Sequence, residues 1–234
     1  MLRNLKSLYS YKLAALDGDI GHVEDFYFND KSWTIHYLVA STGAWLTDRL
    51  VLISPQAFGR FDEIDGKALL INLTRKQIEN SPPIESHKPV SRQYEIEYHR
   101  YYGWPVYWDA AAMGGLGGYP VVVPPAEKEL ASTQSHNKQG DPHLRSTRAV
   151  AGSQIQTVDG PVGQLTSFIV DDRGWAIRKL VVETGHWYSG KEIFISPSKV
   201  ERISYEDSKV FVTLSKEEIQ SAAENDRAEA GISP

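Results

Sequence analysis

The sequence has 234 residues, of which 41% are hydrophobic and 24% charged, an ordinary balance for one large or two small globular domains. The formal net charge of −5, with no strongly basic segment, argues against direct binding of nucleic acid or of an anionic membrane surface. The absence of cysteine excludes disulfides and thiolate chemistry and is typical of a cytoplasmic protein, and no stretch approaches the roughly 18 to 20 apolar residues of a transmembrane segment.

The first 80 residues predict a small β-rich module. Asp17-Gly18, followed by Gly21, is typical of a turn that needs positive φ angles. A strand over residues 20–28 follows, and a polar turn leads to a second strand over residues 33–39. In this second strand Trp, Ile, Tyr and Val alternate with period two, as on one face of a sheet.

The rest of this module predicts three more strands and a short helix. A strand over residues 49–53 ends at Ser54-Pro55, because proline cannot donate to a strand ladder. A hairpin with arms over residues 58–64 and 67–73 follows. Thr74 then has the position of a helix N-cap, with Gln77 three residues on as in a capping box.

Residues 81–147 are expected to connect two modules, because so long a segment is unusual for a plain loop. Its middle part is rich in aromatic residues, which are the candidates for a protein interface: Tyr94, Tyr98, Tyr101, Tyr102, Trp104, Tyr107 and Trp108. The four leading tyrosines have the spacing of one helix face, which Gly103 and Pro105 would end. These aromatics could cover the outside of a barrel, form an interface, or stack on bases or sugars, a use that the lack of positive charge disfavours.

The remainder of the chain predicts an internal duplication. Residues 157–203 align with residues 15–61 without a gap, at a constant offset of 142, and 16 of the 47 pairs are identical. The identical pairs include Trp33/Trp175 and Asp30/Asp172. We therefore expect a second module over residues 148–222, followed by a polar tail over residues 223–234.

Each module is expected to be all-β and to end in a short helix. Five or six short strands joined by tight turns predict an antiparallel sheet, which at this size can bury its apolar face only by curling into a small barrel. The order Asp-Gly-x-x-Gly, Trp-x-Ile-x-x-Leu-Val, Thr-Gly-x-Trp and Ile-Ser-Pro resembles the PRC-barrel family, twice in one chain. That family includes the cytoplasmic domain of the photosynthetic reaction-centre H subunit and a domain of a ribosome maturation factor. The resemblance covers residues 5–80 and 148–222, and the connector is similar to that of bacterial proteins with two such barrels.

The resemblance implies a fold and a habit of docking onto protein partners, with no implied chemistry or cofactor. The leading hypothesis is a non-enzymatic protein-binding or scaffold protein that forms a homodimer through the connector. One alternative is a soluble accessory or assembly factor of a photosynthetic or other electron-transfer membrane complex, held there peripherally. A second alternative is a ligand sensor or small-molecule enzyme with a cleft between the barrels.

The sequence singles out no catalytic, cofactor-binding or metal residue. Its seven histidines show no spacing typical of a metal site. The run Gly114–Gly118 favours a flexible hinge over a phosphate-binding loop. The carboxylates retained in both modules could serve as an acid–base pair, but a turn role explains them better; they are Asp17, Asp30, Asp159 and Asp172.

Overall fold

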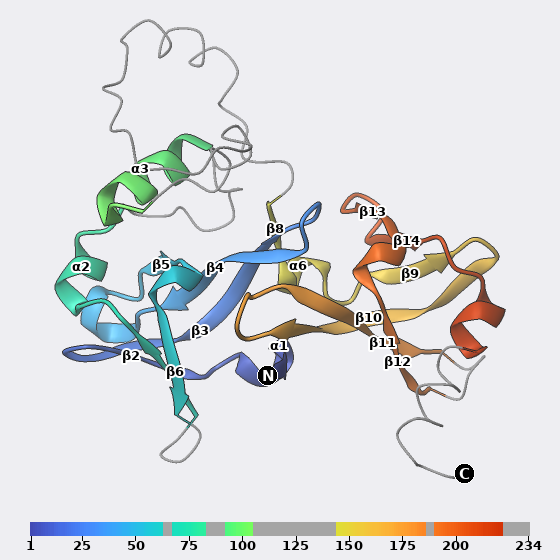
Figure 1. The fold of residues 1–234 in the computed structure, drawn as a ribbon, viewed down its shortest axis with the longest axis horizontal. Coiled ribbons are helices and arrows are strands. Elements are labelled where there is room, and N and C mark those ends of the chain that lie inside the picture. The colour runs from blue at the N-terminus through green and yellow to red at the C-terminus, as the bar shows by residue number, and fades with distance from the viewer. Residues whose placement is uncertain (63–66, 83–91, 105–143, 186–189, 222–234) are drawn as a thin grey trace, which may run out of the picture.

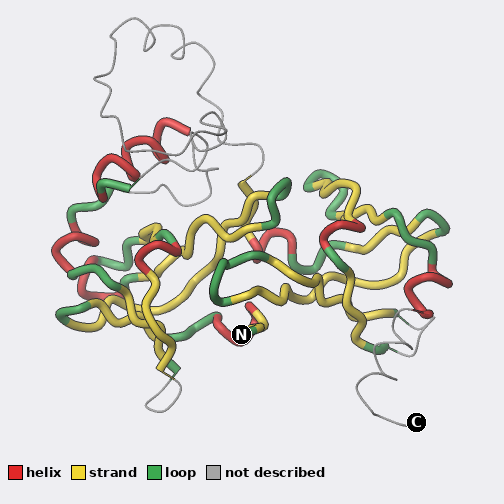
Figure 2. Tube along the Cα trace, in the orientation of Figure 1, coloured by secondary structure: helices red, strands yellow, loops and turns green. Residues whose placement is uncertain are grey.

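The computed structural model of the protein describes residues 1–62, 67–82, 92–104, 144–185 and 190–221, which form a mostly β protein (Figure 1). The strands make two seven-stranded sheets that lie next to each other along the long axis of the molecule (Figure 2). Among the described residues, no helix is long and apolar enough to cross a membrane.

The first sheet has the strand order β5-β4-β3-β2-β7-β6, and β8 also pairs with β3. Because β3 is long, β2 pairs with its first half and β8 with its second half. The strands are β2 (Lys12–Ala15), β3 (Gly18–Asn29), β4 (Thr34–Ser41), β5 (Leu50–Ile53), β6 (Phe58–Asp62), β7 (Ala68–Ile71) and β8 (Leu144–Ser146).

The second sheet has the corresponding order β12-β11-β10-β9-β14-β13, and β1 also pairs with β10. Its strands are β9 (Gln154–Thr157), β10 (Gly160–Asp171), β11 (Ile177–Thr184), β12 (Glu192–Ile195), β13 (Val200–Ser204), β14 (Lys209–Val212) and β1 (Leu2–Asn4). The helices with full bounds are α1 (Leu5–Leu8), α2 (Arg75–Glu79), α3 (Arg92–Tyr102) and α6 (Thr147–Val150), and residues 216–221 are also helical.

The predicted strands are present, but the expectation of a wholly antiparallel sheet is wrong at one pair in each sheet. The pairs β2·β7 and β9·β14 are parallel, because the hairpin after β5 returns to the first strand of the same sheet. Within the described residues, no strand pair joins β5 to β6 or β12 to β13, so neither sheet closes through hydrogen bonds.

The short helices after the last strands begin at capping boxes. Thr74 and Gln77 form the predicted box at α2. Ser215 and Glu218 exchange the equivalent two bonds, at 2.8 and 3.2 Å, at the start of the helix over residues 216–221. Each helix buries one isoleucine, Ile78 or Ile219, in the apolar core.

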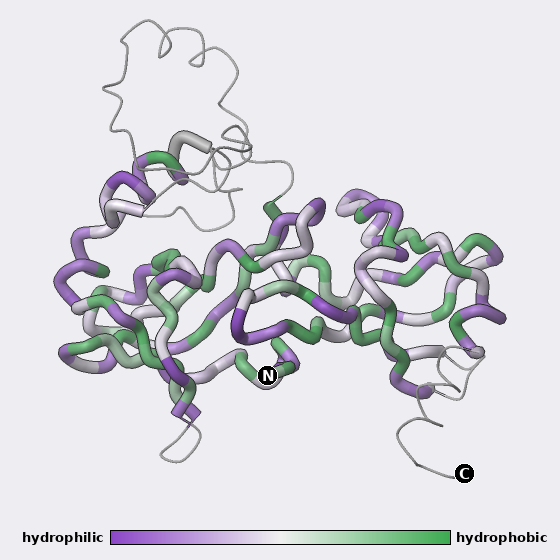
Figure 3. The backbone as a smooth tube through the Cα atoms, in the orientation of Figure 1, coloured by the Kyte–Doolittle hydropathy of each residue, from purple (hydrophilic) through white to green (hydrophobic). Residues whose placement is uncertain are grey.

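The apolar core is continuous across the two sheets. The long strands alternate buried and exposed side chains, and hydrophobic and hydrophilic positions accordingly alternate along the backbone (Figure 3). Phe28 of β3 and Phe168 of β10 are both buried, and their ring centroids are 5.4 Å apart. Burial of this apolar surface, the main driving force for folding, therefore depends on both sheets together.

The two halves of the chain exchange their first strands. β1, at the N-terminus, pairs antiparallel with β10 of the second sheet, and Arg3 lies opposite Val170. β8, which precedes the second half, pairs with β3 of the first sheet, and Arg145 lies opposite Phe28. Both pairings use equivalent positions at the offset of 142, and α1 and α6 follow between the sheets (Figure 1). Residues 144–146 thus contribute a strand to the first sheet, although the sequence placed them in the connector.

The sheets also meet through the turns that precede β4 and β11. The backbone N–H of Ile35 donates to Trp175 O at 2.8 Å, and that of Ile177 donates to Trp33 O at 2.7 Å. Both tryptophans have a left-handed backbone, with φ of 53° and 54°. Trp175 places its side chain against Phe26 of the first sheet, with ring centroids 6.1 Å apart. The junction is therefore made of backbone bonds as well as apolar contacts.

Candidate functional site

The helix α3 ends where Gly103 adopts a positive φ, as the sequence predicts. It lies against β4 and β5 of the first sheet, where the fully buried Tyr98 anchors it. The Tyr98 hydroxyl donates to Leu52 O and accepts from the Ser54 N–H, both at 3.0 Å. This side chain thereby satisfies the Leu52 carbonyl of β5, an end strand of the sheet, and the N–H of Ser54 just after it.

A buried polar cluster fixes the helix on this face. The Tyr37 hydroxyl donates to Glu95 Oε1 at 3.0 Å and lies 3.1 Å from His99 Nε2. Since Tyr37 uses its proton on Glu95, the bond to His99 requires a proton on Nε2. All three side chains are at most 3% exposed. These two hydrogen bonds of Tyr37 hold α3 in one orientation on the sheet, and the buried Glu95 Oε2 takes no part in them.

The described aromatics of the connector serve mainly to pack α3 on the sheet. Tyr102 is half-buried and stacks on Trp104 with ring centroids 4.6 Å apart, and burial raises the pKa of Tyr102 to about 12. Tyr101 is 41% exposed, and its hydroxyl donates to Gln77 O. Of the remaining candidates, Tyr94 lies in α3 with an undescribed side chain, and Tyr107 and Trp108 lie outside the described residues.

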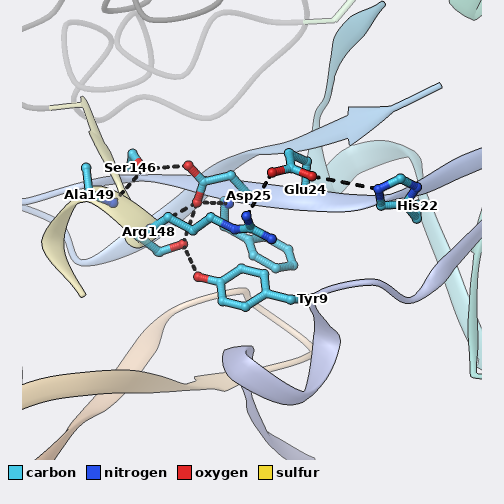
Figure 4. Close-up of polar contacts among 9 residues, drawn as sticks. Tyr9, His22, Glu24, Asp25, Ser146, Arg148 and Ala149 are labelled. Atoms are coloured by element: carbon cyan, nitrogen blue, oxygen red, sulfur yellow. Dashed lines mark hydrogen bonds and ion pairs between the residues drawn. The ribbon is translucent and has the colours of Figure 1, made fainter. Parts of the chain in front are cut away.

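Asp25 of β3 holds the exchanged helix α6 in place (Figure 4). Its carboxylate accepts from the hydroxyls of Ser146 and Thr147, at 2.5 and 2.9 Å, and from the Arg148 N–H at 3.1 Å. These donors belong to the N-terminus of a helix, where a negative charge is stabilised. Burial is the largest effect on this carboxyl and raises its pKa, against the hydrogen bonds.

Ser167 has the same role in the second sheet. Its hydroxyl accepts from the Lys6 N–H at 3.1 Å and donates to Asn4 Oδ1 at 2.5 Å, so that it caps α1. Asp25 and Ser167 are equivalent positions at the offset of 142. A buried carboxylate and a neutral hydroxyl therefore perform one structural task in the two sheets.

The carboxylates retained in both halves also contact structural partners. Asp30 and Asp172 lie in turns, as predicted, but each accepts from an arginine of the exchanged strand: Arg145 for Asp30 and Arg3 for Asp172. The N-terminal ammonium, together with Arg3, holds the pKa of Asp172 below its usual value.

Asp17 and Asp159 receive the backbone N–H of Arg75 and of Lys216, at 2.7 and 3.1 Å. These N–H groups belong to the first turns of the terminal helices, which begin after Thr74 and Ser215. The two aspartates thus connect the first turn of each half to its last element. In the hydrogen bonds described, none of these four aspartates is paired with another of the four, so the bonds do not form an acid–base pair.

The exchanged strands were not predicted, although the sequence carries a signal for them. Leu2-Arg3 and Leu144-Arg145 are identical and obey the same offset of 142, upstream of the aligned block. Two residues are too few to stand out by themselves. The recurrence of an arginine at both positions is explained by long-range partners, Asp172 for Arg3 and Asp30 for Arg145, which no local pattern reveals.

Two further features bear on the ligand-sensor alternative. A shallow hollow of about 430 Å³ is lined by residues of β9, β10 and β11, within the second sheet rather than between the sheets. In the part of the chain that the structure describes, no three His, Cys, Asp or Glu side chains gather closely enough to hold a metal ion.

Comparison of the chain with protein-family models and with curated proteins gives no match.

Proposed function

We propose that this protein is a non-enzymatic scaffold that binds a protein partner, built from two PRC-type barrels that arose by internal duplication. The matching strand orders and the constant offset of 142 at equivalent contacts support the duplication. The motif order of the PRC-barrel family, present twice in the sequence, supports the barrel assignment. The barrels would close through side-chain packing around the shared core.

One observation carries the scaffold function. The polar residues retained in both halves hold the molecule together: Arg3 and Arg145 reach across to Asp172 and Asp30, and Thr42 and Thr184 each bind a backbone carbonyl at 2.8 Å. A retained catalytic centre would instead direct such groups at a common point. The retained set therefore favours a rigid framework whose distinguishing surfaces differ between the halves.

The mass of the protein in its own cell extract tests the scaffold function. Size-exclusion chromatography of the extract should place the chain in a complex larger than the purified protein forms alone, because a scaffold is held by its partner. The complex should persist in an extract filtered free of small metabolites. Elution at the mass of the purified protein, in the extract as in buffer, would contradict the proposal.

A homodimer is the second part of the proposal, and the exposed Tyr101 together with residues 105–143 is its expected contact region. Sedimentation velocity over a concentration series should show a dimer. Deleting residues 90–125 is a poor test, because it removes α3 and uncovers the buried Tyr37. The sharper variant is Tyr107→Ser with Trp108→Ser, which leaves α3 complete. A wild-type monomer at every concentration would contradict the dimer.

A further inference from the structure

One face of the second sheet matches the face that α3 covers on the first sheet. On the first sheet this face is formed by Tyr27, Tyr37, Val39, Leu50, Leu52 and Leu144, which contact the aromatic residues of α3. The equivalent positions on the second sheet are Ile169, Lys179, Val181, Glu192, Phe194 and Leu2, and we call them the second-sheet face. Among the described residues, no helix occupies the second-sheet face as α3 occupies the first.

The exposure of two equivalent apolar side chains differs sharply between the two faces, whereas Val39 and Val181 are both buried, at 2% and 0%. Leu52 is 1% exposed beneath α3, whereas Phe194 is 43% exposed. Leu144 is 8% exposed, whereas Leu2 is 58% exposed. Because both sheets have the same strand order, we attribute the difference at these two positions to α3, which packs on Leu52 and Leu144. The second-sheet face thus exposes Phe194 and Leu2 where the first sheet buries Leu52 and Leu144.

The backbone at the edge of this face is also equivalent. On the first sheet, Leu52 O and Ser54 N–H bind the Tyr98 hydroxyl. Their counterparts are Phe194 O and Ser196 N–H, at the end of β12, which is likewise an end strand. Ser54 is buried, whereas Ser196 is exposed. A tyrosine on an incoming helix can make the same two bonds here, as edge strands commonly do with added elements.

The charge of the face selects the partner. Lys179 takes the place of Tyr37, the residue that binds Glu95 of α3, and its ammonium lies 5.3 Å from the Phe194 ring centroid. A helix that binds this face in the same orientation as α3 on the first sheet would place the residue equivalent to Glu95 next to this ammonium. A carboxylate there gains a charge-assisted bond, and a basic residue is repelled.

We propose that the second-sheet face binds an amphipathic helix of a partner protein, with a carboxylate followed three residues later by a tyrosine, in the manner of Glu95 and Tyr98. This inference rests on the scaffold function and assigns that function a surface. A second copy of this chain is not the occupant, because each copy has a single α3 and already buries it on its own first sheet.

The test uses the full-length protein and a peptide of residues 92–104 as the probe helix. A staple between positions 96 and 100, both exposed in α3, holds the short peptide helical. We expect the peptide to bind. Phe194→Asp should weaken the binding about tenfold or more, since it removes the central apolar contact and adds a charge.

A charge-swap experiment distinguishes specific binding at this face from non-specific hydrophobic binding. Lys179→Glu should weaken the native peptide about fivefold or more, and a peptide carrying Glu95→Lys should recover the loss on that variant. The matched control is Val158→Asp, because Val158 is 71% exposed at the β9–β10 turn and outside the face. No binding to the wild type at about 1 mM, or equal binding to the wild type and all three variants, would overturn the proposal.

Three outcomes assign the face differently or separate it from the scaffold function. If Phe194→Asp without peptide converts a dimer into a monomer, the face joins two copies, which overturns the partner helix. If the Phe194→Asp protein keeps the large complex of the extract, the docking face is wrong and the scaffold function stands. If the wild-type protein never enters a larger complex, the scaffold function itself fails.

Discussion

Arg3 of β1 and Asp172, in the turn after β10, form an ion pair with Nε and Oδ2 2.9 Å apart, across 169 residues of sequence. The pair of Arg145 with Asp30 repeats it at 2.7 Å on the other side of the junction. Both partners of the first pair are only 15% exposed, so solvent screens them less than a surface pair. These two pairs mark the ends of the strand exchange, and they explain why residues far apart in the chain depend on each other.

The first prediction concerns the energy of this pair. Arg3→Ala should lower the free energy of unfolding by about 1 to 2 kcal/mol, because the substitution removes the ion pair with Asp172 and the cation–π contact with Phe61. Urea unfolding of the single and double variants with Asp172→Ala should show coupling between the two residues. The control is Arg178→Ala, whose pair with Asp171 is more exposed and should contribute less. Additive single losses for Arg3 and Asp172 would contradict the assignment.

The second prediction follows from the exchange itself. Removing residues 1–8 deletes β1 and α1, which pair with β10 and bury Leu5 and Leu8. Amide hydrogen exchange should therefore accelerate at residues 169–171 of the second sheet, more than 160 residues away, because their ladder partners are gone. Exchange in β4 and β5, beneath α3 on the first sheet, is the internal control. Acceleration confined to the first sheet would mean that the halves do not exchange strands in solution.

Part of this architecture could be predicted from the sequence and part could not. The long strands, the capping boxes and the end of α3 at Gly103 were predicted because each has a local signal: period-two alternation, a Thr-x-x-Gln pattern, or a glycine. β1 and β8 have three residues each, which is too short for periodicity. Their partners are chosen by long-range contacts, such as Asp25 with the Arg148 N–H, which no local pattern reveals. The packing of Tyr98 on β5 was one of several open alternatives, since a helical aromatic stripe does not say what it faces.

The third prediction is that Trp175 stabilises the sheet to which it does not belong. Its ring is 5% exposed and lies 4.7 Å from the Phe58 centroid of β6. Trp175→Ala should cost about 3 to 5 kcal/mol and should loosen β6, as measured by urea unfolding and by hydrogen exchange. Trp33→Ala is the comparison, because the equivalent Trp33 is half-buried and stacks on Phe28 of its own sheet. Trp33→Ala should lower the unfolding free energy by less than Trp175→Ala does, and it should not accelerate hydrogen exchange in β13.

The fourth prediction concerns the pH dependence of stability. Burial raises the pKa of Asp25 in the folded protein above its unfolded value, which is about 3.9. Between these two values the folded state binds more protons, so the contribution of Asp25 to the unfolding free energy falls as pH rises through that window. Asp25→Asn removes this fall.

The measurement is chemical denaturation of the wild type and of Asp25→Asn from about pH 4 to pH 7. The free energy of unfolding of the variant should rise relative to that of the wild type as the pH rises. This holds whatever stability the variant loses at the lowest pH through its missing hydrogen bonds. Asp19→Asn is the matched control, because it removes an exposed carboxylate from the same strand. A constant difference in unfolding free energy between the wild type and Asp25→Asn across this range would contradict a raised pKa of Asp25 in the folded protein.

The last prediction separates close packing from backbone strain at the glycines that both halves retain. A Cβ at Gly163 of β10 would lie 2.1 Å from Glu183 O on the neighbouring strand, and one at Gly21 would lie 1.9 Å from Ser41 O. Gly21 has a φ of +129°, whereas the backbone of Gly163 is not in the left-handed region. Gly163→Ala should therefore cost about 2 to 4 kcal/mol through the clash alone, because a backbone carbonyl cannot move aside without breaking the ladder. Gly185→Ala is the control, since no heavy atom lies within 4 Å of a Cβ added there. Its melting temperature in thermal unfolding should be close to that of the wild type. Equal melting temperatures for the two variants would show that β10 and β11 do not approach each other this closely, and the strand register that positions the second-sheet face would then be wrong.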